Sequence, residues 1–208
     1  MTKHIIWDWN GTLFHDIDAV VGATNAVFKP YELPEVTVDG FRAVYTRPIW
    51  VAYERLLGRP LTEGEWELLD DGFHEHYFRL SDACALAADA ELALTSWTGS
   101  QSLCSMAPHA HLVPMVDSFG ITRHFTRVDG LLGTTGGEKA AHMAAHIEAI
   151  GVDPGKILVI GDSMDDGFAA RHVGARAVLY TGGMTTRADL ESTGFPVVDT
   201  LSDALDHA

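Results

Sequence analysis

The stretch Ile5-Ile6-Trp7-Asp8-Trp9-Asn10-Gly11-Thr12-Leu13-Phe14 organises this chain. An apolar run leads into Asp8, a tight polar turn follows, and apolar residues then return. This order predicts a buried strand that carries a carboxylate at its C-terminal end. Ligands of open α/β sheets bind beyond the carboxyl ends of the strands, which is where Asp8 would stand. The alternative is a strand followed by an Asx-type turn without a chemical role.

Two kinds of pattern divide the rest of the chain. From Gln101 onward, short apolar runs alternate with helical periodicities, and the most apolar run is 156–160. Continuous apolar strands that alternate with helices predict an α/β fold with a parallel sheet covered by helices on both faces. Residues 17–90 show helical periodicity without a convincing strand. We therefore expect a core domain of residues 1–16 and 91–208 and an inserted α-helical cap domain of residues 17–90.

Local signals predict several of the individual elements. Thr62 and Glu65 have capping-box spacing, which predicts that a helix begins there. A further helix is expected around 84–94 and a short extended segment at 124–128. Residues 138–150 predict an amphipathic helix. Its apolar face would contain Ala140, Met143, Ala144 and Ile147, and its polar face His142, His146 and Glu148.

The charge balance limits the possible partners. Among 208 residues, Lys and Arg number 14 and Asp and Glu 29, which gives a formal net charge of −15. Such an acidic chain repels phosphate backbones at long range, so we expect no nucleic-acid partner. A small anionic substrate is still compatible with this charge if a metal ion or local cations neutralise its site.

The cysteine usage and the hydropathy pattern point to the cytoplasm. Cys84 and Cys104 have no CxxC spacing, which predicts reduced, packed thiols rather than a zinc site or a disulfide. The N-terminal residues show no signal-peptide pattern, and no apolar run approaches the roughly 20 residues that a membrane helix needs. We expect a cytoplasmic monomer or homodimer without a membrane partner.

A second predicted strand also ends in acids. Asp162 follows the apolar run 156–160, and Asp166 comes one helical turn later on the same side. Three carboxylates that meet at one sheet edge repel each other unless a cation lies among them. Oxygen ligands without His or Cys partners suit Mg²⁺ rather than Zn²⁺. The alternative for Asp162-Ser163 is a helix N-cap, which would explain one acid but not the whole set.

Asp8 has a second possible role, as a nucleophile towards phosphorus. A carboxylate can attack a phosphoryl group when a metal ion and nearby donors neutralise the phosphoryl oxygens. Lys139, at the start of the predicted amphipathic helix, would supply a cation. The hydroxyl of Ser105 and the next backbone N–H, that of Met106, could bind an oxyanion. A helix cap or a solvated charge is the alternative for such residues.

Four segments in this order resemble the motifs of the haloacid dehalogenase (HAD) superfamily. They are Asp8-Trp9-Asn10-Gly11-Thr12, Ser105, Lys139 and Gly161-Asp162-Ser163-Met164-Asp165-Asp166. The resemblance spans nearly the whole chain, and its first and fourth motifs are specific. The helical insert between the first and second motifs resembles the cap of the phosphoglycolate-phosphatase-like branch. The resemblance implies a Rossmann-like core and a Mg²⁺-dependent hydrolase of small phosphorylated metabolites.

The resemblance also implies roles for the matching residues. Asp8 would be the nucleophile and a Mg²⁺ ligand, and Asn10 would offer its backbone carbonyl to the metal. Asp162 would bind the metal directly, and Asp166 would hold a metal water or Lys139. The phosphoryl group would be bound by Thr12, Ser105 and Lys139.

Asn10 departs from the family pattern. Most phosphatases of the superfamily carry a second aspartate there, which protonates the leaving group and then activates water. General acid–base help is typically worth about 10²–10⁴-fold, and an asparagine cannot transfer a proton. Three interpretations remain open: a substrate that needs little protonation, such as an acyl phosphate; a substitute group, with His15 or Asp16 as candidates; or slow turnover, in the extreme a phospho-ligand-binding protein.

Other branches of the superfamily fit less well. Phosphonate hydrolases carry alanine at this position and use a cap lysine, whereas the predicted cap here offers only Lys29. Haloacid dehalogenases need no metal, so Asp162 and Asp166 argue against that branch. Substrate specificity is expected from the cap, with Thr46 and Arg47 as candidates and His15 beside the motif. Arg47 could bind a second anionic group, or it could be an ordinary exposed arginine at a helix start.

Overall fold

The computed structural model describes residues 1–133 and 139–208, and its contacts divide the chain into two compact units. The core unit comprises Met1–His15 and Leu86–Ala208, and the helical unit comprises Asp16–Ala85. Glu138, where the amphipathic helix was expected to begin, lies outside the described residues. The assignment of residues 17–90 as a cap stays a prediction.

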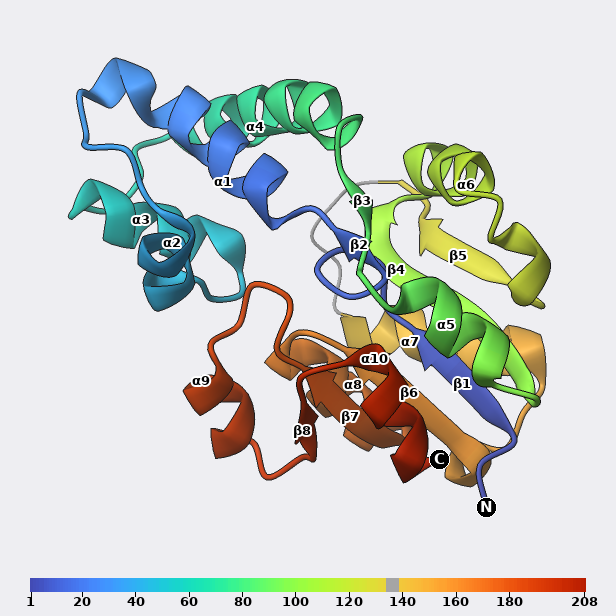
Figure 1. The fold of residues 1–208 in the computed structure, drawn as a ribbon. Helices are drawn as coiled ribbons and strands as arrows, with labels where there is room; N and C mark the ends of the chain where they lie inside the picture. The colour runs from blue at the N-terminus through green and yellow to red at the C-terminus, as the bar shows by residue number, and fades with distance from the viewer. Residues whose placement is uncertain (134–138) are drawn as a thin grey trace. The chain divides into compact units, whose positions relative to one another are not determined.

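A six-stranded parallel sheet forms the middle of the core unit (Figure 1). Its order is β5-β4-β1-β6-β7-β8, and every pairing between neighbours is parallel. The strands are β1 (His4–Trp7), β4 (Ser100–Pro108), β5 (Val128–Leu131), β6 (Ile157–Gly161), β7 (Arg176–Tyr180) and β8 (Val197–Val198). A second sheet pairs β2 (Phe14–His15) with β3 (Ala85–Leu86). The expected α/β fold with a parallel sheet is confirmed.

The central strand, β1, lies at the switch point of the sheet. Its neighbours β4 and β6 flank it on opposite sides, and the later strands are added outward from each. Trp7 is in register with Leu103 of β4 and Ile160 of β6. Because ligands of such sheets bind where the strand order reverses, the segments after β1, β4 and β6 surround the expected site.

Helices cover both faces of this sheet. In Figure 1, α7 and α8 lie behind it, and α5 and α10 lie in front. The helices of the core unit are α5 (Ala90–Ser96), α6 (His109–Ser118), α7 (Lys139–Ile150), α8 (Met164–Val173), α9 (Arg187–Ser192) and α10 (Leu201–Ala204). Short 3₁₀ turns occur at Thr122–His124, Pro154–Lys156 and Leu205–His207.

The apolar face of α7 differs from the prediction at two positions. Met143 and Ile147 are buried as expected, against Ile6, Val159 and other core side chains. His146, which was placed on the polar face, is only 1% exposed, whereas Ala144 is exposed. Periodicity assigned His146 by its polarity, but buried polar partners make its burial possible.

A chain of hydrogen bonds accommodates two buried histidines. His4 bonds to Ser100 Oγ through Nδ1 and to Ser102 Oγ through Nε2, each at 2.7 Å. Ser102 Oγ also lies 2.7 Å from His146 Nε2, and His146 Nδ1 lies 2.7 Å from Asp129 Oδ2. A hydroxyl, an imidazole and a carboxylate thus line up as in a nucleophilic triad. Ser102 has no exposed surface, however, so this chain ties β1, β4, β5 and α7 together instead.

Burial keeps these histidines neutral. Desolvation, together with the nearby His146, lowers the pKa of His4 to about 4. Desolvation also lowers the pKa of His146, although Asp129 opposes this shift. In the unfolded chain these histidines are therefore protonated near pH 6.5. In the folded chain they are protonated only at a lower pH.

We expect the free energy of unfolding to fall as the pH drops from about 6.5 to about 4, because unfolded His4 is protonated in this window and folded His4 is not. Urea unfolding of the wild type and of His4→Gln at pH 7.5 and pH 5 measures this effect. Comparing the two proteins cancels the contribution of other titrating groups. The wild type should lose more stability than His4→Gln, and equal losses would contradict the prediction.

The helical unit contains four α-helices. They are α1 (Ile17–Phe28), α2 (Val38–Val44), α3 (Ile49–Leu57) and α4 (Glu65–Ser81), with a 3₁₀ turn at Lys29–Tyr31. Helices α1 and α4 pack together, and Phe28 meets Tyr53 edge-on with ring centroids 5.1 Å apart. In α4, Trp66 contacts Tyr53 and Leu69 is buried. The unit therefore has its own aromatic core.

Three local predictions were wrong in detail. The capping box at Thr62 is only half formed: Glu65 accepts from the Thr62 backbone N–H at 2.8 Å, but the N-cap is Gly64. The helix expected around 84–94 is instead the short strand β3, a turn at 88–89 and then α5, which begins only at Ala90. The extended segment expected at 124–128 begins in a 3₁₀ turn and becomes β5 only at Val128.

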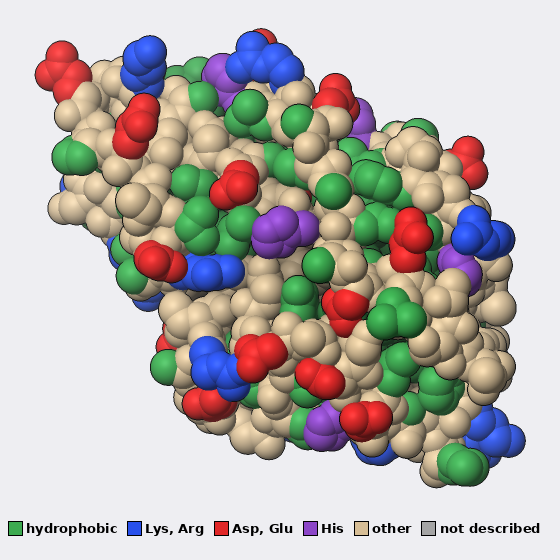
Figure 2. Space-filling model, viewed as in Figure 1, with side chains coloured by type: hydrophobic (Ala, Val, Ile, Leu, Met, Phe, Trp, Pro, Cys, Tyr) green, Lys and Arg blue, Asp and Glu red, His purple; other side chains and the backbone are tan. Residues whose placement is uncertain are grey.

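Surface charge and hydropathy complete the description. On the face in Figure 2, acidic and basic side chains are interspersed. The excess of acidic residues is therefore not gathered into one patch there. Among the described residues, none of the helices combines the length and the apolar character needed to cross a lipid bilayer.

Candidate active site

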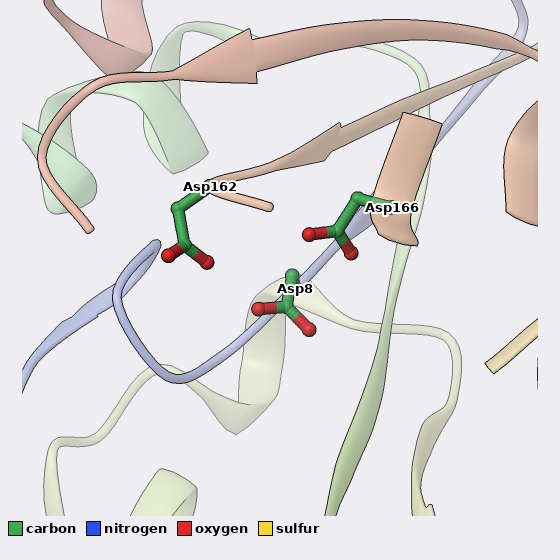
Figure 3. A group of neighbouring side chains, drawn as sticks. All are labelled: Asp8, Asp162 and Asp166. Atoms are coloured by element: carbon green, nitrogen blue, oxygen red, sulfur yellow. The ribbon is translucent and has the colours of Figure 1, made fainter. Parts of the chain in front are cut away.

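Three buried carboxylates meet at the carboxyl edge of the parallel sheet (Figure 3). Asp8 is 7% exposed, Asp162 is 5% exposed and Asp166 is 1% exposed. One oxygen from each lies within 4.8 Å of the others. The sequence predicted this convergence from strand ends and helical spacing, because parallel strands deliver their C-terminal residues to the same edge.

A compact turn holds Asp8 at the end of β1. Its backbone N–H donates to Ile160 O at 2.9 Å, which continues the ladder towards β6 by one residue. The following turn closes through bonds from Phe14 N–H to Trp9 O and from Gly11 N–H to Phe14 O, both 2.9 Å. The rings of Trp9 and Phe14 stack with centroids 5.1 Å apart. The turn is thus fixed by both backbone and apolar contacts, which restrains Asp8.

Asp166 belongs to a capping box at the start of α8. Ser163 is the N-cap, and its hydroxyl accepts from Asp166 N–H. The Asp166 Oδ2 atom accepts from the Ser163 N–H at 3.0 Å and from its hydroxyl at 2.6 Å. The N-cap interpretation of this motif is therefore correct for Ser163. It does not exclude a second role for Asp166, whose other oxygen points to Lys139.

Lys139 is the cation of this cluster. Its ammonium group lies 2.6 Å from Asp8 Oδ1 and also forms an ion pair with Asp166 Oδ1. Burial by itself would lower the pKa of Lys139, but Asp166 and Asp8 outweigh burial and raise it. Lys139 is therefore charged, and the buried group of three acids and one lysine carries a net charge of −2 when all of them are ionised.

Two of the acids show the electrostatic cost of this arrangement. Burial raises the pKa of Asp8, Lys139 lowers it, and Asp166 raises it further, with a net upward shift. Burial, followed by the charges of Asp8 and Asp166, raises the pKa of Asp162, although a backbone N–H from Met184 opposes the shift. Both acids therefore resist ionisation in the absence of a further positive charge.

The donor set fits a hard divalent cation. Its candidate ligands are carboxylate oxygens, without sulfur or imidazole nitrogen among the members of the cluster. Oxygen ligands of this kind suit Mg²⁺, and a charge of +2 would balance the local charge of −2. The positive charge of the ion would then oppose the burial and the carboxylate repulsion that raise the pKa of Asp162.

The remaining predicted residues of the core unit lie in the turn after β1 and in β4. Thr12 is fully buried, and its hydroxyl donates to Asp162 Oδ1 at 3.3 Å. Asn10 is half-buried and forms an isolated bridge with Phe14. Ser105 is buried in β4, two residues past the partner of Trp7, and its Oγ accepts from Ala107 N–H at 3.1 Å. Met106 is half-buried next to it.

The specificity candidates outside the motifs have a different setting. Thr46 and Arg47 lie in the helical unit, where Arg47 Nε donates to the Tyr45 hydroxyl at 3.2 Å. His15 is exposed at the end of β2. Asp16, the other candidate for proton transfer, is buried and accepts a 2.6 Å bond from the Tyr77 hydroxyl. That bond favours a structural role for Asp16.

One contact of the cluster was missed by the sequence analysis. The backbone N–H of Met184 donates to Asp162 Oδ2 at 2.9 Å in a fully buried bond. Met184 lies in the loop after β7, 22 residues further along the chain. A backbone donor leaves no residue-type signature, so only the adjacent Gly182-Gly183 pair could have drawn attention to this loop.

Comparisons with known proteins relate the chain to HAD-like hydrolases. A family model described as HAD-hydrolase-like matches residues 136–204, which include the Asp162 and Asp166 segment. A phosphoglycolate phosphatase of Caulobacter vibrioides is 28% identical over 189 residues, which cover 87% of this chain and 80% of that protein. The chain is therefore similar to HAD-like hydrolases in residues 136–204 and to a phosphoglycolate phosphatase over most of its length.

A second relative and a solved structure are also similar to this chain. A phosphoglycolate phosphatase of Chromobacterium violaceum is 25% identical over 210 residues, with 90% of each chain covered. A solved structure of a hydrolase of the haloacid dehalogenase-like family from Streptococcus pneumoniae superposes with a TM-score of 0.86. It covers 99% of this chain and 98% of that one at 17% identity, so it bears on the HAD fold alone.

Removing the Lys139 charge should destabilise the metal-free protein. In Lys139→Met, the Asp8 and Asp166 carboxylates lose their buried counter-charge, and breaking such a pair typically costs about 3–5 kcal/mol. Denaturant unfolding with EDTA at pH 8 measures this cost. Lys156→Met is a matched control, because its pair with Asp153 is exposed at 3.4 Å and such pairs contribute less than about 1 kcal/mol. Equal losses in the two variants would contradict this reading of the cluster.

Proposed function

We propose that this protein is a Mg²⁺-dependent phosphatase of small phosphorylated metabolites that acts through an aspartyl-phosphate on Asp8. The observation that carries the proposal is the buried cluster of Asp8, Asp162, Asp166 and Lys139, in which one lysine faces three carboxylates. The cluster offers a nucleophile, oxygen ligands for a metal ion and a fixed cation. The names of two relatives, both phosphoglycolate phosphatases, support this substrate class and make 2-phosphoglycolate the first compound to test.

The reaction would proceed in two displacements at phosphorus. A carboxylate oxygen of Asp8 attacks the phosphorus atom, the bond to the leaving oxygen breaks, and the freed alkoxide takes up a proton. Water then attacks the same phosphorus atom and loses a proton, the bond to Asp8 breaks, and inorganic phosphate and the Asp8 carboxylate are released. Each half is an in-line transfer, so positioning and charge stabilisation account for most of the catalysis.

The neighbouring residues would position the groups and stabilise their charge. Asp8, Asp162, Asp166 and the Asn10 backbone carbonyl would hold Mg²⁺, and this ion would supply positive charge next to the transferring phosphoryl group. Lys139, which bonds to Asp8, would orient the nucleophile and share the charge of the phosphoryl oxygens. Thr12, Ser105 and the Met106 backbone N–H would donate to those oxygens.

Substrate selection is assigned to the helical unit, which would act as a cap over the core. Arg47 is exposed there, and its guanidinium could bind a second anionic group on the substrate. Thr46 precedes it, and His15 is the last residue of the core unit before the chain enters the helical unit. The carboxylate of a compound such as 2-phosphoglycolate is the kind of group that an arginine would select.

Asn10 supports a second candidate function. Its amide can hydrogen-bond to a leaving oxygen but cannot protonate it, so ordinary esters would react slowly. Acyl phosphates release a carboxylate that needs little protonation and would be less affected. If neither class is turned over, the same site would serve as a phospho-ligand-binding site. These alternatives stay within the HAD superfamily and differ only in turnover.

Loss of the nucleophile should abolish turnover. Asp8→Asn keeps the size of the side chain but removes the attacking charge, so we expect phosphate release to fall by at least about 10³-fold. A panel of phosphate esters and acyl phosphates, assayed with Mg²⁺ and with EDTA, measures this loss and the metal requirement together. Phosphate release that persists in EDTA or in Asp8→Asn would reject the proposal. Inactivity on the whole panel, with calorimetric binding of the same compounds, would favour the binding protein.

The missing proton donor can be tested at Asn10. Asn10→Asp should raise kcat on phosphate esters by up to about 10²–10⁴-fold, because it adds a general acid next to the nucleophile. It should change kcat on acyl phosphates much less, and this contrast is the internal control. Asn10→Ser changes the side chain without adding an acid and should not accelerate the esters. If Asn10→Asp leaves ester turnover unchanged, another residue already transfers the proton.

A further inference from the structure

The loop after β7 reaches into the acid cluster with its backbone. Residues 181–186 connect β7 to α9, and Gly183, Met184 and Thr185 are buried in the middle of this loop. Its contact with the cluster is the 2.9 Å hydrogen bond from Met184 N–H to Asp162 Oδ2. The Met184 side chain, which is 7% exposed, anchors the same residue in the core. The loop thus presents a fixed peptide to the carboxylate of Asp162.

Gly183 permits this approach because it has no side chain. A Cβ atom at Gly183 would lie 1.9 Å from Asp162 Oδ2 and 2.2 Å from its Cγ. Both distances are far below any van der Waals contact. Any other residue would therefore push either the loop or the carboxylate out of place. The restriction is one of space, and it falls on the oxygen that accepts the Met184 bond.

A second segment closes on the same carboxylate from the first motif. A Cβ at Gly11, where φ is +72°, would lie 2.6 Å from Asp162 Oδ2. The next residue, Thr12, donates to Asp162 Oδ1 at 3.3 Å. Asp162 is therefore enclosed by two glycine backbones, and both of its oxygens have protein donors. These contacts restrict the movement of the carboxylate towards either segment.

We propose that the Gly183–Met184 peptide is the positioning element that orients the Asp162 carboxylate for the divalent cation. The inference rests on the proposed function, in which Asp162 is a metal ligand. A carboxylate that is already fixed loses little freedom when it binds the ion, so the peptide increases affinity by preorganisation. It acts on the metal through Asp162, and it touches neither the substrate nor the phosphorus atom.

Gly183→Ala tests this role by calorimetric titration with Mg²⁺. Partners that orient a ligand typically contribute about 10–100-fold in metal affinity, so we expect the Kd of Gly183→Ala for Mg²⁺ to rise by that factor. The half-saturating Mg²⁺ concentration for activity should rise with it, and kcat at saturating Mg²⁺ should recover. Gly155→Ala is the control, because a Cβ there meets its nearest atom at an ordinary 3.5 Å. A folded Gly183→Ala with wild-type Mg²⁺ affinity would overturn the inference.

A measurement on the wild type covers the case in which Gly183→Ala does not fold. The amide signal of Met184 in a ¹⁵N-labelled sample should shift during Mg²⁺ titration with the calorimetric Kd, because its acceptor becomes a ligand. A Met184 signal that stays fixed while Mg²⁺ binds would overturn the positioning role and leave the proposed phosphatase intact. If the wild type binds no Mg²⁺, both the proposed function and this inference fail.

Discussion

Burial of three carboxylates around a single lysine is the constraint on which the rest of the structure depends. Each acid is at least nine-tenths buried, and Lys139 can compensate only one of the three negative charges. The isolated cluster is therefore unfavourable, as the raised pKa values of Asp8 and Asp162 show. A fold maintains such a cluster only if the surrounding elements restrain every member, and here β1, β6 with α8, and α7 each deliver a charge. The same imbalance supports the proposal that the site binds a divalent cation.

The parallel sheet separates this electrostatic cluster from a second polar system. The carboxyl edge collects Asp8 and Asp162, while His4 near the amino end of β1 begins the hydrogen-bonded chain through Ser102 and His146 to Asp129. The two systems solve the problem of buried polar groups differently. The two histidines are neutral, and the Asp129 carboxylate at the end of the chain is paired with Arg127, so the chain stabilises the core without a ligand. The acid cluster remains short of positive charge, which is typical of a site that binds a cation and an anionic substrate.

The sequence predicted the parts of this structure that side-chain type encodes. Apolar runs that end in Asp8 and Asp162 predicted two parallel strands and their shared edge, and the spacing to Asp166 predicted a third acid on one helix turn. His146 was placed wrongly, because a polar residue on an amphipathic helix is normally solvated and its partners Ser102 and Asp129 lie on other strands. Element boundaries around 84–94 and 124–128 were also wrong, since turn geometry there outweighs weak periodicity. The Met184 contact was not predictable at all, because every non-proline residue has the same backbone donor.

The position of Asp162 shows how the orientation of a buried carboxylate can depend on residues that provide no chemistry of their own. Gly11 and Gly183 have no Cβ atom, and this allows their backbones to approach the Asp162 carboxylate closely. Met184 contacts the carboxylate through its peptide N–H, so none of the three resembles a functional residue by type. Side chains supply the charges of the cluster, whereas the backbone determines where one of those charges points. At Asn10, by contrast, the side chain itself matters. It has nearly the size of an aspartate side chain, but it cannot transfer a proton. In the proposed phosphatase, the backbone around Asp162 would therefore govern metal binding, and the functional group two residues after Asp8 would govern turnover.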